Sequence, residues 1–334
     1  MPRLPTVVVG AGLAGACAAA VLAQRGPVTV LGDAEPGASG AAAGLVHPFT
    51  GRRAHRAWRA AEARAALERM AARAGVAVSV SGVLRPAQTP RQAADFREAA
   101  RLFPEEATWT EAAAEAAERW PGVACPLGAL WIPDGGHVSV PAFVRGLLDA
   151  ARRDGADVRT ARLLDWDSCS AITDCGDVRF DRLVLCPGHG VAALPQLAGR
   201  PFGYVRGQTV TLGAALPAGF PAVAGGVYVV PTPRGAVVGA TFEHAFSHLD
   251  PDPAASADLR ARAARLVPAL ADAEITDARV GVRVTVPTAV SPERLPVLER
   301  VAAGVWLFTG LGSRGLLTAP LLAETLPDVL PEDG

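Results

Sequence analysis

The sequence predicts an α/β fold in which a doubly wound domain is interleaved with a second, α+β domain built on a mixed sheet. Three observations predict this architecture. The 334 residues, 50% of them hydrophobic, are enough for roughly two domains of about 150 residues each. A short apolar run, a glycine-rich turn and an alanine-rich stretch open the chain. Further pairs of an apolar run and a small-residue turn occur near 180–188 and 304–315, so the first domain is predicted to be discontinuous.

The first strand and helix are predicted at the N-terminus. Thr6-Val7-Val8-Val9 is a β-branched run typical of a buried parallel strand, and an alanine-rich helix to Gln24 and a second strand over 28–31 follow. The turn between them reads GxGxxG. Its first glycine allows the turn, its second lets backbone approach a pyrophosphate, and its third lets the helix pack on the sheet. Free N–H groups at the helix N-terminus attract phosphate. This Rossmann-like unit predicts a dinucleotide site at Gly10, Ala11, Gly12, Leu13, Ala14 and Gly15.

A carboxylate that binds the ribose normally ends the second strand of such a unit. Gly32 occupies that place here, but the Gly26-Pro27 turn is one residue short. Asp33 therefore keeps the usual spacing from Gly10. We expect Asp33 to bind the ribose, with Glu35 as the alternative.

A second small-residue loop, 37–48, comes soon after the second strand. Small residues let backbone run beside a large flat ligand, and a serine hydroxyl in such a loop can reach a phosphate. In sequence and placement the loop resembles that of FAD-dependent oxidoreductases of the D-amino-acid-oxidase and glycine-oxidase type. The resemblance implies FAD rather than a nicotinamide cofactor. It also implies cofactor contacts at Ser39, Gly40, Ala43, Gly44 and Leu45.

The resemblance continues along most of the chain. Residues 180–188 look like the family's third nucleotide-domain strand and turn, which adds Gly188 to the expected contacts. Residues 304–320 are similar to its last strand, glycine loop and closing helix, whose N-terminus would favour an anionic reduced flavin. Within the family, 205–208 and 312–320 look most like the oxidoreductase domain of a bifunctional bacterial enzyme that modifies wobble uridine in tRNA. The expected contacts in the last loop are Gly310, Leu311, Gly312, Ser313, Arg314, Gly315 and Leu316.

The order of the motifs assigns 1–75, 150–200 and 295–334 to the FAD-binding domain, and 76–149 and 201–294 to the substrate domain. Alternation with period two predicts strands, and alanine-rich charged stretches predict helices. The predicted strands are 76–81, 130–132, 204–212, 227–230, 236–241 and 279–286. The predicted helices are 53–74, 90–102, 110–119, 142–154 and 254–271. The flavin is expected between the two domains.

Four residues are candidates for orienting the substrate. In the family an arginine after a Gly-x pair holds the substrate carboxylate, which would be Arg283 here; a structural salt bridge is the alternative. In this sequence Leu295-Pro296 lies more residues after Arg283 than the matching step does in the family, which implies an insertion between them. Tyr228 is a candidate substrate contact or a core residue. Likewise, His47 would bind substrate or flavin, or pack between the domains. Arg206 is either a second anion contact or a charge at a strand edge.

The charged residues exclude several chemistries. All 32 basic residues are arginine, against 33 acidic residues, so the net charge is −1. Without lysine, the sequence excludes a phosphate-loop lysine, Schiff-base catalysis and a lysine that activates oxygen at the flavin. Seven arginines against two glutamates over 52–73 are either a solvated helix face or a surface for the phosphates of tRNA.

The sequence predicts no metal site, because the five cysteines form no CxxC pair that could complete a zinc site. We expect a cytoplasmic protein without a membrane partner.

Three functions remain open from the sequence. The first is oxidation of the C–N bond of a carboxylate-bearing amine, such as an amino acid, glycine or an N-substituted glycine. Hydride would pass to flavin N5, and hydrolysis of the imine would follow. The second is oxidation of the carboxymethylamino group on wobble uridine of tRNA. The third is flavin binding without turnover. Substrate, electron acceptor and oligomeric state are left open.

Overall fold

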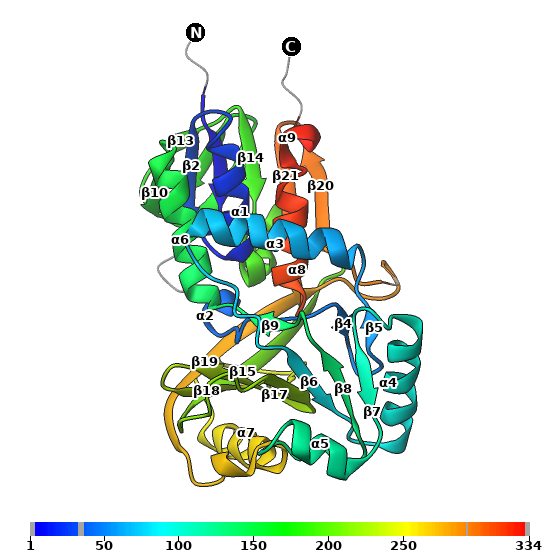
Figure 1. Cartoon of the computed structure of the whole chain (residues 1–334). Coiled ribbons are helices and arrows are strands. Elements are labelled where there is room, and N and C mark those ends of the chain that lie inside the picture. The colour runs from blue at the N-terminus through cyan, green and yellow to red at the C-terminus, as the bar shows by residue number, and fades with distance from the viewer. Residues whose placement is uncertain (1–3, 33–36, 292, 331–334) are drawn as a thin grey trace.

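The computed structural model describes residues 4–32, 37–291 and 293–330, and it forms two lobes (Figure 1). One lobe carries both ends of the chain and a six-stranded sheet, and the other carries an eight-stranded sheet. The two long strands β15 (Gly203–Gly213) and β19 (Glu274–Thr285) belong to the second sheet and run toward the first lobe. They bring residues far apart in the sequence to the region between the lobes.

The six-stranded sheet is parallel except for one edge strand, β20, which is antiparallel to β21. The four central strands of this sheet are mostly apolar and are buried on both faces, as parallel strands between two layers require, whereas the strands at its two edges are largely exposed. The order of the strands is β10 (Asp157–Thr160), β2 (Val28–Gly32), β1 (Thr6–Val9), β14 (Arg182–Leu185), β21 (Val305–Thr309) and β20 (Val297–Ala302).

Alternate residues of these strands pack into different layers. Val8 and Val184 pack with the helices, whereas Val7 and Leu183 pack with a small three-stranded sheet and the turns that follow it. The helices are α1 (Leu13–Leu22), α3 (Ala60–Ala74), α6 (Val140–Arg153), α8 (Gly315–Ala323) and α9 (Leu326–Val329). The small sheet is β11 (Leu163–Trp166), β12 (Ser170–Thr173) and β13 (Val178–Arg179), and the turns are η1 (Gly188–Ala193) and η2 (Pro195–Leu197).

The expected domain boundary between 149 and 150 falls inside α6. Phe143 and Leu147 of this helix are buried in the same cluster as α1 and α3. Because an amphipathic helix belongs to the core that buries its apolar face, we propose to place the boundary before residue 140.

The eight-stranded sheet is mixed, with one parallel pair, β16 and β6, among antiparallel neighbours. Its order is β19, β15, β18 (Gly235–Gly239), β17 (Val227–Thr232), β16 (Ala222–Gly225), β6 (Val83–Pro86), β8 (Ala129–Ile132) and β7 (Thr108–Thr110). The helices of this lobe are α4 (Pro90–Leu102), α5 (Ala113–Arg119) and α7 (Pro253–Leu266), with the turn η3 (Pro268–Leu270).

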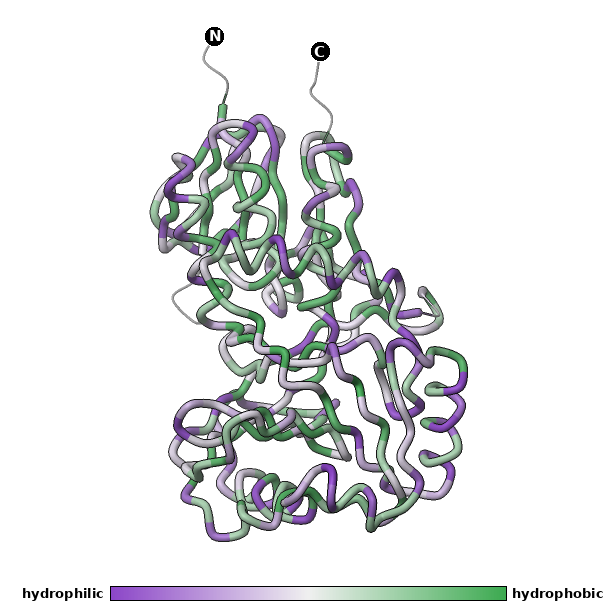
Figure 2. Tube along the Cα trace, in the orientation of Figure 1, coloured by the Kyte–Doolittle hydropathy of each residue, from purple (hydrophilic) through white to green (hydrophobic). Residues whose placement is uncertain are grey.

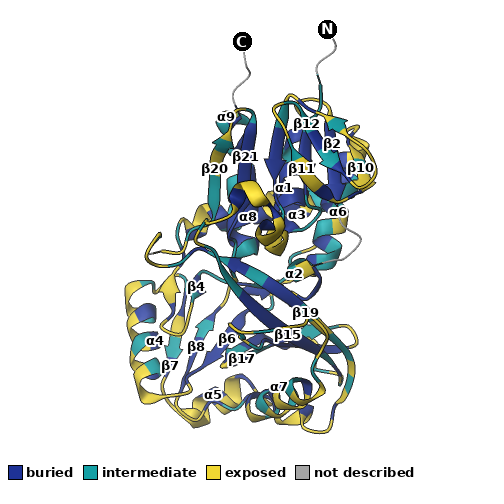
Figure 3. Cartoon of the chain, turned by 180° about the vertical axis from the view of Figure 1, so that it is seen from behind, coloured by how far each residue is buried: buried dark blue, intermediate teal, exposed yellow. Residues whose placement is uncertain are grey.

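Short elements between the sheets complete the described chain. They are α2 (Gly37–Gly40), β3 (Leu45–Val46), β4 (Phe49–Thr50), β5 (His55–Arg56) and β9 (Gly136–His137). The hydropathy trace in Figure 2 alternates along the outer helices and is mainly hydrophobic along the central strands. Figure 3 shows the same distribution as burial, with the exposed residues on the outer faces of α4, α5 and α7.

Most predicted elements of the second lobe are present, and two predictions were wrong. No strand covers 76–81: only Ser79 forms a bridge, to His137, and the strand comes later as β6. The helix predicted from 53 begins at Ala60, because 55–56 pair with 49–50 as a small hairpin. None of the helices in the described part of the chain has the length and apolarity needed to cross a lipid bilayer.

Candidate active site between the two sheets

The first glycine-rich turn joins β1 to α1 at the carboxyl end of the parallel strands. Gly10 has a φ of 103°, and a Cβ on it would collide with the carbonyl of Cys186. A Cβ on Gly15 would collide with the carbonyl of Gly10. The predicted roles of these two glycines in the turn and in close packing therefore have a steric basis.

Gly12 is the N-cap of α1, and because glycine has no side chain it cannot cap the helix. Ser39 Oγ accepts a hydrogen bond from the backbone N–H of Leu13 at 3.0 Å. The N–H groups of Ala14 and Gly15 have no hydrogen-bond acceptor within residues 4–32, 37–291 and 293–330. The start of α1 is thus a place where an anionic group can bind. The predicted ribose ligands Asp33 and Glu35 lie outside the described residues.

The second small-residue loop, 37–44, lies against the long strands of the other lobe. The Ala41 carbonyl accepts a hydrogen bond from Thr209 Oγ1 at 3.0 Å, and the Gly40 carbonyl accepts one from Arg279 Nη1 at 3.1 Å. A Cβ on Gly281 of β19 would press on the backbone of Ala38. Gly44, with a φ of 80°, packs against the Val138 carbonyl. Ala43 and Leu45 in and after this loop are half-buried.

The C-terminal glycine loop, 310–315, lies between α1 and β19. Gly315 packs against Leu13, since its Cβ would be 2.9 Å from Leu13 Cδ2. The N–H of Gly312 donates to the Val284 carbonyl at 2.9 Å, and Leu311 forms a bridge with Thr285. The structure therefore places three of the predicted cofactor loops around one region next to β19. Leu316 is buried behind this loop, and Ser313 is exposed at its surface.

Two other predicted cofactor residues have specific places. Gly188 starts the η1 turn after β14, and this turn contacts α2 and β19. The Arg314 side chain donates through Nη2 to the carbonyls of Glu293 and Arg294, both at 2.6 Å. Burial lowers the pKa of Arg314. This side chain thus ties the inserted segment before Leu295 to the glycine loop.

The face of the eight-stranded sheet that meets the 37–44 loop carries Tyr228 and Arg283. Tyr228 and Thr209 are both register partners of Gly239, so the three residues share one face. A Cβ on Gly239 would be 2.5 Å from Tyr228 Oη and 2.7 Å from Thr209 Cγ2. Glycine at this position makes room for the tyrosine ring to cross the neighbouring strand.

Arg283 extends over the same face of the sheet. Its Nη2 occupies the space that a Cβ on Gly207 would fill, and it donates to the Thr241 carbonyl at 2.7 Å. Its Cζ lies 4.1 Å from the centre of the Phe242 ring. Only this one of its five N–H donors is hydrogen-bonded within the described part of the chain, which leaves donors for a ligand.

Arg283 and Tyr228 influence each other's protonation. Burial lowers the pKa of Arg283, and the nearby Tyr228 opposes that shift. Burial raises the pKa of Tyr228 to about 12, and the positive charge of Arg283 partly offsets this. At neutral pH the site therefore presents a charged guanidinium beside a protonated hydroxyl, a combination that suits a carboxylate ligand.

His47 lies in the turn between β3 and β4. Its Nδ1 is buried and has no hydrogen-bond partner among the described residues. Burial, with the positive charge of Arg85 as a second cause, lowers the pKa of His47 to about 3. His47 is therefore a neutral imidazole over the physiological pH range.

Sequence reasoning missed Arg85, which is 6% exposed on β6. Its guanidinium donates to the carbonyls of Phe49 at 2.9 Å and Gly51 at 2.6 Å and stacks on Phe96. Register through β16 places it on the same face of the sheet as Tyr228. A charge inside the apolar run 83–87 was the available signal, since such a residue is rarely buried without a structural task.

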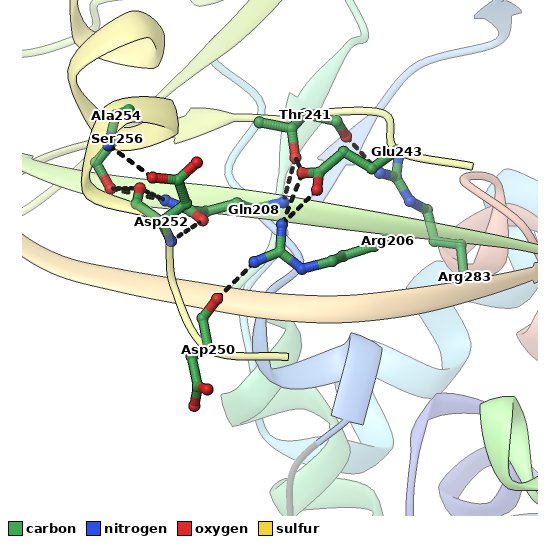
Figure 4. A network of polar contacts seen from close by, with 9 residues as sticks. All are labelled: Arg206, Gln208, Thr241, Glu243, Asp250, Asp252, Ala254, Ser256 and Arg283. Atoms are coloured by element: carbon green, nitrogen blue, oxygen red, sulfur yellow. Dashed lines mark hydrogen bonds and ion pairs between the residues drawn. The ribbon is translucent and has the colours of Figure 1, made fainter. Parts of the chain in front are cut away.

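Arg206, expected to be either a second anion contact or a charge at a strand edge, lies on the face of the sheet opposite Arg283. Arg206 pairs in register with Val282, one position from Arg283, so its side chain points to the opposite face of the sheet. It is 2% exposed, and Nη1 contacts both carboxylate oxygens of Glu243 at 2.7 Å. Nη2 donates to the Asp250 carbonyl at 2.5 Å. Figure 4 shows this network, in which Gln208 also binds the start of α7 through Asp252 and Ser256.

Five of the seven arginines in segment 52–73 form ion pairs, two with glutamates of the segment and three with acidic residues from elsewhere in the chain. Arg56 pairs with Glu106 at 2.7 Å and Arg69 with Glu324 at 2.6 Å. The other pairs are Arg59 with Glu62, Arg64 with Glu68, and Arg73 with Asp154. Only Arg52 and Arg53 of this segment lack an ion pair within the described ranges. The local excess of positive charge is smaller than the sequence alone indicates.

Comparisons with known proteins agree with this arrangement. A family model described as FAD dependent oxidoreductase matches residues 6–328. The tRNA 5-methylaminomethyl-2-thiouridine biosynthesis bifunctional protein MnmC of Maricaulis maris is 32% identical over 332 residues, covering 98% of this chain and 52% of that protein. The chain thus spans about half the length of the curated relatives that it matches.

Solved structures share the fold over nearly the whole chain. The glycine oxidase of Geobacillus kaustophilus superposes with a TM-score of 0.84 at 25% identity, covering 98% of this chain and 94% of that one. The iminodiacetate oxidase of Chelativorans sp. gives a TM-score of 0.80 at 25% identity, covering 98% and 96%. The predicted α/β fold class is confirmed.

Proposed function

This chain belongs to the family of FAD-dependent oxidoreductases, and from that premise we propose that it oxidises the C–N bond of a small amine that carries a carboxylate. Membership makes it an FAD-dependent oxidoreductase that acts on amines or amino acids, and FAD its cofactor, as the sequence resemblance implied. The substrate class we propose comprises glycine, other amino acids and N-substituted glycines.

The residues around the start of α1 fit FAD. The free N–H groups of Ala14 and Gly15 lie at the end of a turn whose glycines leave no side chain in front of the helix. We propose that this turn, Ser39 and the 310–315 loop hold the cofactor. Bound FAD supplies the two-electron oxidation, with N5 of the flavin as the hydride acceptor.

We propose that Arg283 and Tyr228 bind and orient the substrate carboxylate. Arg283 has unused N–H donors on a guanidinium that the Thr241 carbonyl and the Phe242 ring hold in place. The protonated hydroxyl of Tyr228 adds a neutral donor from the adjacent strand. A planar guanidinium binds a carboxylate in a fixed orientation, which aims the neighbouring C–H bond.

The chemistry balances without an acid–base triad. The α-carbon of the substrate loses a hydride, its nitrogen loses a proton, and a C=N bond forms. Water then hydrolyses the imine to a 2-oxo acid and ammonia, or to a 2-oxo acid and an amine where the substrate nitrogen carries a substituent. We propose that the neutral imidazole of His47 serves as a hydrogen-bonding group for the cofactor or the substrate at this end of the sheet.

The observation that carries the proposal is the half-buried Arg283 with free donors, held between Gly207, Thr241 and Phe242 on the face that meets the cofactor loops. Purified protein containing FAD should lose its flavin absorbance on anaerobic mixing with glycine, sarcosine or a D-amino acid. A protein that retains the full flavin absorbance with every small carboxylate-bearing amine would overturn the proposal.

A second candidate function is oxidation of the carboxymethylamino group on wobble uridine of tRNA. The relative at 32% identity over 332 residues, named for tRNA modification, favours it. The substrate group is itself a carboxylate-bearing amine, so Arg283 would have the same role. The pairing of most arginines over 52–73 argues against that surface as a tRNA site.

The two candidates separate on substrate size. Flavin bleaching by tRNA that carries the carboxymethylamino group, with no bleaching by any small amine, supports the tRNA function. Bleaching by small amines at a useful rate supports the first proposal. Absence of bleaching by either would support a flavin-binding protein without turnover.

A further inference from the structure

We propose that Phe242 is a specificity-determining residue, whose exposed ring selects carboxymethyl amines that carry a flat or apolar substituent on nitrogen. The inference rests on the proposed function, because it requires the substrate carboxylate to be bound by Arg283. It narrows the substrate class from any carboxylate-bearing amine to N-substituted glycines with such a group.

Phe242 is in an unusual environment for a phenylalanine. It is 64% exposed, although large aromatic side chains are mostly buried in folded proteins. The ring stacks on Arg283, with 4.1 Å between the ring centre and Cζ. One face of the guanidinium is therefore covered, so a carboxylate has to approach its edge, where the N–H donors lie. The large exposed area of Phe242 then lies directly beside the bound carboxylate group.

The segment that carries Phe242 is held from both sides of the sheet. The Thr241 carbonyl accepts the hydrogen bond from Arg283 Nη2, on the site face. The backbone of Glu243 exchanges two hydrogen bonds with Arg206, at 2.9 and 3.0 Å. The side chains of the same two residues form the ion pair on the opposite face (Figure 4).

These contacts give Arg206 a positioning role. Arg206 is 2% exposed, and its ion pair with Glu243 fixes the residue directly after Phe242. Thr241 Oγ1 donates to Glu243 Oε1 at 2.6 Å and accepts from the backbone of Gln208 at 2.8 Å. The aromatic ring is therefore exposed on a fixed backbone, which lowers the entropy cost of using it for binding.

This arrangement favours particular substrates. Glycine has no substituent on nitrogen, so it gains only the carboxylate contacts of Arg283 and Tyr228. An N-substituent that leaves the site toward solvent passes beside Phe242, where a flat group can stack on the ring. Arg283 thus binds the carboxylate of the substrate, and the exposed ring of Phe242 beside it contacts the substituent on nitrogen.

The test compares glycine with N-benzylglycine in anaerobic stopped-flow bleaching of the FAD-loaded protein. For the Phe242→Ala variant, the apparent dissociation constant for N-benzylglycine should rise about tenfold more than that for glycine, because loss of the support that the ring gives Arg283 affects both substrates alike. The limiting bleaching rate should change little for either substrate. Phe242→Tyr should restore the wild-type ratio, because it keeps the aromatic face.

Leu249→Ala is the matched control, since Leu249 is an exposed apolar residue (47%) of the same connection and should leave both constants unchanged. Equal effects of Phe242→Ala on both substrates would mean that the ring only holds Arg283, and would overturn the inference. No effect on either substrate would overturn it too. If neither substrate bleaches the wild-type flavin but sarcosine or a D-amino acid does, the inference fails and the proposed function stands. If none of these amines bleaches it, the proposed function fails as well, and both results are seen before any variant is made.

Discussion

Both faces of the eight-stranded sheet carry polar side chains, including an arginine, but these side chains differ in how many hydrogen bonds they form within the protein. On one face, Arg206 and Gln208 are buried and bonded to Glu243, Asp250, Asp252 and Ser256. On the other, Arg283 lies in the space above Gly207 with one hydrogen bond, and Tyr228 lies in the space above Gly239. One position along a strand separates Arg206 from the register partner of Arg283. A buried arginine with its partners supplied by the chain supports the structure, whereas one with spare donors is available to a ligand.

The glycines explain how the site face stays open. Gly207, Gly239 and Gly281 all belong to the face that meets the cofactor loops, and a Cβ at each would collide with Arg283, Tyr228 or Ala38. Glycine inside a strand normally weakens it, so three of them at one place indicate close approach of other groups. On the opposite face the corresponding strands carry side chains that pack on α7. The comparison predicts different consequences for variants on the two faces.

The largest effect is expected at Arg283. Arg283→Ala should raise the KM of a carboxylate-bearing amine by about 100- to 1000-fold, because it removes the charged partner of the substrate carboxylate at about 3–4 kcal/mol. The protein should still bind FAD, since the cofactor loops do not depend on this side chain. Steady-state kinetics with sarcosine, together with the flavin content of the purified variant, measure both outcomes.

A matched control for this variant is Arg262→Ala. Arg262 is a part-exposed arginine of α7, bonded to the Gly226 carbonyl at 2.8 Å. It should leave KM unchanged. Unchanged steady-state kinetics in the Arg283 variant would remove the carboxylate role from this residue.

The other face should respond in stability. Arg206→Met leaves the Glu243 carboxylate without its partner, and removal of one member of a buried ion pair costs about 3 kcal/mol. Because Glu243 is half-buried, water can meet part of its need, so this value is an upper bound. Urea unfolding of the FAD-loaded protein at fixed cofactor concentration measures the change. The double variant Arg206→Met/Glu243→Met should recover part of the loss, and a double variant as unstable as the single one would contradict a pairwise origin.

The contrast between these faces was only partly predictable from sequence. The GxGxxG unit, the last glycine loop and Arg283 stand in local patterns that sequence shows, because each depends on residues close together in the chain. Arg206 was misjudged because its partner Glu243 comes from a strand connection 37 residues away. For the same reason the sequence did not show that three acids from elsewhere in the chain, Glu106, Asp154 and Glu324, pair with arginines of 52–73. Arg85 gains its meaning only from register, which places it on the site face, and Phe242 only from its contact with Arg283.

The next effect concerns pH on the site face. The folded-state pKa of His47 is about 3, below its ordinary 6.5, so between these values the unfolded chain binds a proton that the folded chain does not. Stability should therefore rise with pH over this window and level off above about pH 6.5. Between pH 7 and pH 5 wild type should lose about 2 kcal/mol more than His47→Gln, which has no titrating group there. Urea unfolding at both pH values measures these losses of stability. If wild type and His47→Gln lose equal amounts between pH 7 and pH 5, His47 becomes protonated in the folded state and the prediction is wrong.

The smallest effect should come from the hydroxyl of Tyr228. Tyr228→Phe keeps the ring that fills the space over Gly239 and removes only Oη, the atom next to that glycine. If the hydroxyl donates to the substrate carboxylate, KM should rise about fivefold, the worth of one neutral donor at about 1 kcal/mol, with kcat nearly unchanged. The variant should also weaken binding of benzoate, a carboxylate without an oxidisable C–N bond, by a similar factor in a flavin difference titration.

Because Arg283 keeps its charge in the Tyr228→Phe variant, an effect as large as that of Arg283→Ala would mean that the tyrosine positions the arginine instead of contacting the ligand. A variant with wild-type KM and benzoate affinity would place Tyr228 among the core residues and leave Arg283 as the anion-binding group of the site face.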